Sequence, residues 1–163
     1  MIDLVRVDDR LIHGQVAIGW TAATGANTIL VVNDAAQADA TQAMALKMAA
    51  PSGVALYIRS VAESGEIVRK FATAQKARVM VLLKTVADAA ALVEASGGAI
   101  TSLNIGGQRA GEGRIKLTDH TAVTAEELAL LDGLQVQGVE IDLRMLPRDT
   151  PVPFDRARAR KAS

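Results

Sequence analysis

The stretch VDDRLIHGQ, residues 7–15, brings together residue types that can carry phosphoryl chemistry. His13 is one of only two histidines in the chain, and Gly14 follows it where a helix is predicted to begin. A helix N-terminus offers unpaired N–H groups and partial positive charge, and glycine lets an anion approach the backbone closely. Arg10 adds a permanent charge whose planar donors suit phosphate oxygens. Because imidazole is largely uncharged and nucleophilic near neutral pH, this arrangement predicts phosphoryl transfer to the histidine itself.

Alternative interpretations of these residues stay open at this point. His13 can also be a polar loop residue whose ring bonds to nearby backbone. Asp8 and Asp9 would repel a phosphoryl group, so we expect them to orient the imidazole, pair with Arg10 or cap the loop. For at least one of the two carboxylates, a simple turn role is the favoured interpretation.

A glycine-rich loop, NIGGQRAGEGR at 104–114, is a second candidate wall for an anion site. Its glycine spacing matches neither the dinucleotide fingerprint nor the P-loop. The backbone N–H groups of Gly106 and Gly107 and the side chain of Arg109 would face the anion in this interpretation. The alternative is a hairpin turn.

Other polar residues at predicted strand ends have simpler explanations. The pairs Asn33-Asp34 and Lys84-Thr85 both suit helix caps, although Lys84 can also add positive potential over the site. His120 is expected in a surface loop and Trp20 in packing. No grouping of residues predicts a metal site or a cofactor.

The elements that must position these residues alternate between strand and helix. Continuous apolar strands separated by helices predict a single-domain α/β fold with an open, mainly parallel central sheet and helices on both faces. In such folds the functional site lies at the carboxyl ends of the strands. This rule makes the loops 8–14, 33–35, 84–86 and 104–114 the candidates. Strands are expected at 2–7, 27–33, 53–60, 77–84, 100–106 and 138–146, and helices at 14–25, 34–50, 61–75, 85–98 and 124–135.

Composition narrows the class of protein. The chain has 163 residues, half of them hydrophobic, and no cysteine, so disulfides, zinc-thiolate sites and iron–sulfur clusters are excluded. The early charges in MIDLVRVDDR do not suit a signal peptide, and no apolar run reaches the length of a membrane span, so we expect a cytoplasmic protein. A formal net charge of zero argues against nucleic acid as the main partner.

The last twenty residues, 144–163, carry six basic side chains against two acids. We expect a solvated, frayed C-terminus. The alternative is a weak attraction to an acidic partner or to anionic lipid head groups.

Several motifs resemble one known family. The chain resembles the cytoplasmic IIB components of the bacterial phosphotransferase system (PTS), in the mannose/fructose/sorbose class. The likeness covers residues 1–150, which we expect to form the IIB domain, and leaves 151–163 as a basic C-terminal tail. The motifs are RVDDRLIHGQV at 6–16, ND at 33–34, AAPSGV at 49–54, LNIGG at 103–107 and VEIDLRMLPRD at 139–149.

The resemblance implies a function. His13 would accept a phosphoryl group on Nδ1 from a phosphohistidine of the IIA component and pass it to a sugar that crosses the membrane through the IIC and IID components. Arg10 would support the phosphoryl group, and Gly14 and Gln15 would supply backbone donors. The protein would then be peripheral to a membrane transporter, with its sugar and any homo-oligomer left open. The remaining residues expected to support phosphate or loops are Asp8, Asp9, Lys84, Thr85, Gly106 and Gly107.

The sequence departs from the family pattern in places, and two rival functions remain. Gln108 follows NIGG where many relatives have methionine, and Thr85 is the small hydroxyl residue available in LLKTV. A non-catalytic regulatory module could use His13 phosphorylation as a signal. A histidine phosphatase or mutase would need arginine in place of Ile12, and its second histidine would have to be His120.

Overall fold

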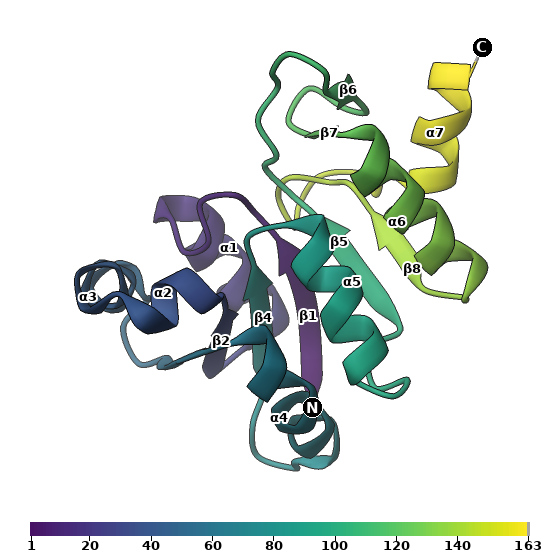
Figure 1. Ribbon diagram of the computed structural model, residues 1–163. Helices are drawn as coiled ribbons and strands as arrows, with labels where there is room; N and C mark the ends of the chain where they lie inside the picture. The colour runs from purple at the N-terminus through teal and green to yellow at the C-terminus, as the bar shows by residue number, and fades with distance from the viewer. Residues whose placement is uncertain (163) are drawn as a thin grey trace.

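Six parallel strands form the central sheet in the computed structural model, which describes residues 1–162. Their spatial order is β3-β2-β4-β1-β5-β8, and every neighbouring pair runs parallel (Figure 1). This arrangement confirms the predicted α/β fold with an open parallel sheet. The strands are β1 (Ile2–Val7), β2 (Thr28–Val32), β3 (Ala55–Arg59), β4 (Val79–Leu83), β5 (Ser102–Ile105) and β8 (Glu140–Asp142).

Helices cover both faces of this sheet, as the apolar strands require. One layer holds α1 (Gly14–Thr24), α2 (Asp34–Ala38) and α3 (Ala40–Ala49), and the other holds α4 (Val61–Thr73), α5 (Val86–Ala95) and α6 (Ala125–Val136). Successive residues of a strand pack against opposite helix layers, because their side chains point alternately to the two faces of the sheet. Thus Val31 and Leu82 pack in the α1 layer, and Val32 and Leu83 pack in the α4–α6 layer.

The helix predicted for residues 34–50 is two helices, so that expectation was wrong. Asp39 ends α2 and begins α3, with its backbone in an extended conformation. Its side chain accepts hydrogen bonds from the backbone N–H groups of Thr41 and Gln42. An aspartate in the middle of an apolar pattern therefore acts as an N-cap, which competes with helix continuation.

The C-terminal segment also differs from the expected frayed end. Residues Phe154–Ala162 form helix α7, which lies beside α6 in Figure 1 and is joined to it by the Arg158–Asp132 ion pair. Phe154 is fully buried and Ala157 nearly so, both within the core of the α4–α6 layer. Two apolar residues three apart are enough to anchor one turn of helix, although the other residues of the segment are mostly charged.

Two further strands, β6 (Ile115–Lys116) and β7 (Ala122–Val123), form a small antiparallel hairpin after β5. Within residues 1–162, no helix has the length and apolar character that crossing a membrane requires.

Candidate functional site

Three of the four loops selected from the sequence meet at the carboxyl edge of the sheet. Strand β1 lies between β4 and β5, so the loops that follow these strands are neighbours. The backbone N–H of Asp8 donates to the carbonyl of Leu83 (2.9 Å), and that of Asp9 donates to the carbonyl of Gly107 (2.9 Å). The fourth loop, 33–35, follows β2 on the far side of β4 and serves as a cap, with the Asn33 side chain accepting from Ala36 N–H.

The loop between β1 and α1 is held by its own apolar residues. Leu11 and Ile12 are buried in the core on the α1 side of the sheet. Leu11 adopts a left-handed backbone conformation (φ 57°), which costs a residue with a Cβ atom about 1 kcal/mol, and burial of its side chain offsets this cost. The loop is thereby fixed, and His13 emerges from it with a side chain that is 18% exposed.

Asp8 is the centre of the site. Its side chain is fully buried, and Oδ2 lies 2.9 Å from Nη2 of Arg6 and 3.1 Å from Nε2 of His13. Oδ1 accepts a hydrogen bond from the backbone N–H of Arg10 (3.2 Å), and Oδ2 accepts one from that of Gly107 (3.4 Å). One carboxylate thus joins β1, the histidine loop and the loop after β5.

The charge state of Asp8 determines which nitrogen of His13 is free. Burial alone would raise the pKa of Asp8, but the hydrogen bond with His13 and the positive charge of Arg6 outweigh it, and the pKa lies below its usual value. The group is therefore ionised at neutral pH and can only accept hydrogen bonds. Nε2 of His13 must then carry the hydrogen, which leaves the lone pair of Nδ1 unshared.

Arg6 supports Asp8 from inside the protein. Its side chain is 1% exposed, and Nη1 donates a hydrogen bond to Oδ1 of Asn104 on the neighbouring strand. A Cβ atom at position 106 would lie 2.1 Å from Nη2 of Arg6, so only glycine fits there. Burial lowers the pKa of Arg6, and the Asp8 carboxylate opposes that shift.

Arg6 and Asn104 belong to this site, but the sequence pattern did not single them out. Both are polar residues inside strands that otherwise read as apolar and buried. A polar residue in an apolar strand is the signal that could have found them, because a buried charge requires a partner. The partners are 98 residues apart along the chain, so the pair cannot be read from sequence alone.

The second loop, 104–114, lies beside the first. Asp9 accepts a hydrogen bond from the backbone N–H of Arg109 (3.2 Å), and its Oδ2 lies 3.3 Å from Nε of the same arginine. Gln108 is buried, and its amide nitrogen donates to the carbonyls of Lys84 (3.3 Å) and Gly107 (2.9 Å). These contacts fix the loop after β5 against the loops after β1 and β4.

Lys84 and Thr85 both follow β4 at this edge, but only Thr85 caps a helix. The Thr85 hydroxyl accepts from the backbone N–H of Asp88 and thereby caps α5. The Lys84 side chain is exposed at the same edge. Thr85 therefore has the cap role that the sequence offered as its simpler explanation.

The N-terminus of α1 begins directly after the histidine. His13 is the N-cap residue, its backbone is extended, and its side chain makes no capping hydrogen bond. Gly14 (φ 40°) and Gln15 are exposed in the first turn, where N–H groups have no partner within the helix. Arg10 is about half exposed, with Nε 3.8 Å from Oδ1 of Asp8. Together these groups can bind a dianion next to the ring.

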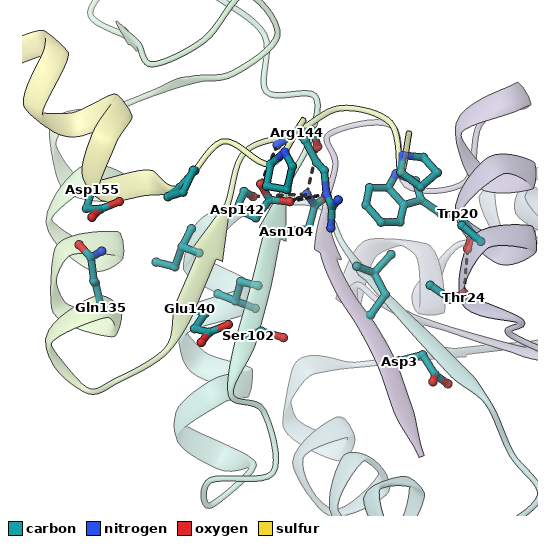
Figure 2. A pocket seen from close by; sticks show the side chains of 17 residues that line it. Asp3, Trp20, Thr24, Ser102, Asn104, Gln135, Glu140, Asp142, Arg144 and Asp155 are labelled. Atoms are coloured by element: carbon teal, nitrogen blue, oxygen red, sulfur yellow. Dashed lines mark hydrogen bonds and ion pairs between the residues drawn. The ribbon is translucent and has the colours of Figure 1, made fainter. Parts of the chain in front are cut away.

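A separate cavity lies away from this site. It has a volume of about 730 Å³ and lies on the α1 side of β1, β5 and β8, with Trp20, Asn104, Asp142 and Arg144 on its wall (Figure 2). The guanidinium carbons of Arg6 and Arg144 are each 5.5 Å from the centre of the Trp20 ring, and the indole N–H donates to the carbonyl of Met145. Trp20 is therefore a packing residue, as expected.

The open parallel sheet with helices on both faces places the chain in the class of α/β proteins, and its site sets the His13 ring beside the N-terminus of α1. Residues 2–162 match the family model described as "PTS system sorbose subfamily IIB component". The chain therefore belongs to this family of IIB components.

Relatives of known name agree with this assignment. The probable phosphotransferase enzyme IIB component of Streptococcus pyogenes serotype M6 is 35% identical over 158 residues, which cover 93% of this chain and 96% of that protein. The mannose-specific EIIAB component of Escherichia coli K12 is 35% identical over 151 residues, 91% of this chain. That match covers 46% of the E. coli protein, so the chain spans about half the length of such two-part relatives.

Solved structures agree as well. The IIBSor domain of the sorbose permease from Klebsiella pneumoniae superposes with a TM-score of 0.87 at 30% identity, covering 98% of this chain and 97% of that domain. The N-acetylgalactosamine-specific IIB component 1 from Escherichia coli gives 0.86 at 26% identity, covering 93% of this chain and 97% of that one.

Proposed function

We propose that this protein is the phosphocarrier of a sugar phosphotransferase system, and that His13 accepts the phosphoryl group on Nδ1. The observation that carries the proposal is the 3.1 Å contact between Nε2 of His13 and the buried carboxylate of Asp8. This contact leaves Nδ1 as the nitrogen with a free lone pair, on a ring that is partly exposed. A donor protein can therefore reach it without any rearrangement of the core.

The chemistry follows from this geometry. The lone pair of Nδ1 attacks phosphorus in line, and the Nδ1–P bond forms while the nitrogen–phosphorus bond of the donor phosphohistidine breaks. Positive charge that develops on the His13 ring is stabilised by the ionised Asp8 at Nε2. Arg10 and the backbone N–H groups of Gly14 and Gln15 hold the equatorial oxygens. In the second transfer, a sugar hydroxyl attacks phosphorus and the bond to Nδ1 breaks.

The other residues hold this arrangement in place. Asp9, Gly106 and Gly107 fix the loop after β5 against the histidine loop, and Lys84 adds positive potential at the same edge. Thr85 supports the site through the cap of α5. In this proposal residues 1–150 carry the phosphotransfer site, and the basic segment from residue 151 onward packs on them through Phe154 and Ala157 of α7.

The partners follow from the same proposal. The donor is a IIA protein that carries phosphohistidine, and the acceptor is a sugar held by the membrane components IIC and IID. The partly exposed His13 ring lies in a loop at the carboxyl edge of the sheet, which allows both partners to reach it in turn through a modest, transient interface. The protein would act in the cytoplasm, at the surface of its membrane transporter. The family names of its relatives support this placement in general terms.

The test is a labelling experiment with purified components. Phosphoenolpyruvate carrying ³²P is passed through the general PTS proteins and a IIA donor to the wild-type chain and to His13→Ala. We expect acid-labile label on the wild type and none on the variant, whose circular dichroism spectrum stays that of a folded protein. Label that persists on His13→Ala would reject the assignment. Restored sugar uptake in a strain lacking its own IIB component would distinguish a carrier from a regulatory module.

A further inference from the structure

A small cleft opens beside the Asp8 carboxylate. Its volume is about 260 Å³, and it is much smaller than the cavity of Figure 2. Its walls come from the histidine loop, the loop after β5, the β6–β7 hairpin and the segment after β8. The lining residues are Asp9, Arg10, Gly107, Gln108, Arg109, His120 and Met145.

The cleft and the His13 ring share a wall. Arg10 and Gly107 line the cleft, and the backbone N–H groups of both residues donate to Asp8, which in turn holds the ring. His13 itself does not line the cleft. A group bound there would therefore sit next to a phosphoryl group on His13 without occupying its place.

The charge of the cleft is positive. Arg109 is 81% exposed and Arg10 is 47% exposed, so both guanidinium groups are available to solvent. Asp9 is the one carboxylate on the wall, and it is already paired with Arg109. The exposed His120 adds a further hydrogen-bonding ring, so the cleft suits an anion.

The position of His120 is set by the backbone on both sides. Its carbonyl accepts from the backbone N–H of Gln108 (3.0 Å), and its own N–H donates to the hydroxyl of Thr118 (3.3 Å). The next residue, Thr121, donates from its hydroxyl to the carbonyl of Gly106. The hairpin that carries His120 is thereby fixed to the same glycine loop that surrounds Arg6 and Asp8.

We propose that this cleft receives a carboxylate side chain of the phosphoryl donor protein, and that Arg109 and His120 thereby help to select and align that donor over His13. This inference rests on the proposed function. A volume of about 260 Å³ is too small for a folded element but admits one acidic side chain. Guanidinium groups bind carboxylates in a planar, two-point geometry, which gives orientation as well as attraction. Complementary charge at the rim of an interface mainly raises the association rate and selects the partner.

The experiment measures phosphotransfer from purified phospho-IIA at varied donor concentration. We expect Arg109→Gln and His120→Gln each to raise KM for the donor about tenfold, while kcat stays within about twofold, because association is weakened and chemistry is not. Arg109→Lys should recover part of the loss. The matched control is Lys76→Gln, an exposed charge at the opposite edge of the sheet, which should leave KM unchanged.

The dependence of KM on salt concentration is an independent test of the proposal. Raising ionic strength should increase KM of the wild type more than that of an Arg109→Gln/His120→Gln double variant, since exposed charges are screened. Unchanged KM in both single variants would overturn the inference, as would a loss confined to kcat. Competition by free inorganic phosphate that disappears in the double variant would also overturn it, in favour of a site for small anions. A wild-type chain that takes no label would instead defeat the proposed function itself.

Discussion

At the scale of single residues, the site depends on the carboxylate of Asp8, which contacts the guanidinium of Arg6 and the imidazole of His13. Asp8 accepts from buried Arg6 on one side and from the His13 ring on the other, so the ring has one orientation and one tautomer. Without Arg6, a fully buried carboxylate would be costly to keep ionised. Arg6 is accordingly a positioning residue that acts on His13 through Asp8.

Replacement of Asp8 tests this relation. Asp8→Asn keeps the size of the side chain but removes the charge that holds the hydrogen on Nε2. We expect phosphotransfer to His13 to slow by at least about 10- to 100-fold, the range found when a carboxylate that orients a metal-binding histidine is lost. Rapid-quench labelling measures the rate, and ¹⁵N NMR of the ring reports the tautomer. An unchanged rate together with an unchanged ring spectrum would contradict the role given to Asp8.

The same variant has a second readout in its stability. Because the pKa of Asp8 in the folded protein lies below its unfolded value, the ionised group stabilises the fold above the unfolded pKa of about 4. This contribution is lost as the pH falls through the lower, folded pKa. Urea midpoints between pH 2 and 7 should therefore drop more steeply on the acid side for the wild type than for Asp8→Asn. Parallel curves for the two proteins would argue against a depressed pKa.

At the scale of elements, the packing of α4 on α5 explains a glycine that weakens the helix pattern. A Cβ atom at Gly65 would lie 2.7 Å from Cβ of Ala95 and 2.9 Å from its carbonyl oxygen. The two helices thus approach closely enough that no side chain fits at this position. The capping box of Ser60 and Glu63 begins α4 and offsets the low helix propensity of glycine.

Two glycine substitutions separate these effects. Gly65→Ala should lower the free energy of unfolding by about 1–3 kcal/mol, because the added methyl overpacks the α4–α5 contact. Gly133→Ala in α6 meets nothing within 4 Å and should raise it by about 0.5–1 kcal/mol through helix propensity. Denaturant unfolding measures both values, and phosphotransfer by the folded proteins should not change. Equal effects of the two substitutions would contradict the close helix approach.

At the scale of the whole molecule, the candidate site and the C-terminal helix lie in different parts of the fold. The carboxyl edge gathers loops that are distant in sequence and holds the reactive ring, the helix N-terminus and the cleft of the further inference. The α4–α6 layer on one face continues into α7, whose Phe154 completes the core. The basic residues of α7 are therefore carried on an ordered helix, and we expect this helix to contribute to global stability.

Phe154→Ala tests that contribution. The side chain is fully buried, so its removal should lower the free energy of unfolding by about 3–5 kcal/mol. Arg156→Gln, at an exposed position of the same helix, should change it by less than about 0.5 kcal/mol. Chemical denaturation of both variants provides the comparison. A loss below 1 kcal/mol for Phe154→Ala would show that α7 adds little to the core.

The sequence by itself determined the elements that have a local signal. Apolar runs such as those of β2 and β4 predicted strands buried on both faces, and their alternation with helices predicted the parallel sheet. The His13-Gly14 pair at a strand-to-helix turn and the loop rule for parallel sheets placed the candidate site at the carboxyl edge. The break between α2 and α3 at Asp39 was not predicted, because the capping role of Asp39 depends on two backbone N–H groups that a periodic pattern does not reveal.

Only the tertiary structure decided how the site is held and what surrounds it. The contacts of Arg6 with Asn104, of Asp9 with Arg109 and of Gly107 with Asp8 each join residues about 100 positions apart. They exist because β1 lies between β4 and β5, an order that no local propensity encodes. The burial of Phe154 likewise depends on where the last helix meets the core. Local sequence pattern specifies the helices and strands, whereas strand order and side-chain packing specify which distant polar and charged groups come into contact.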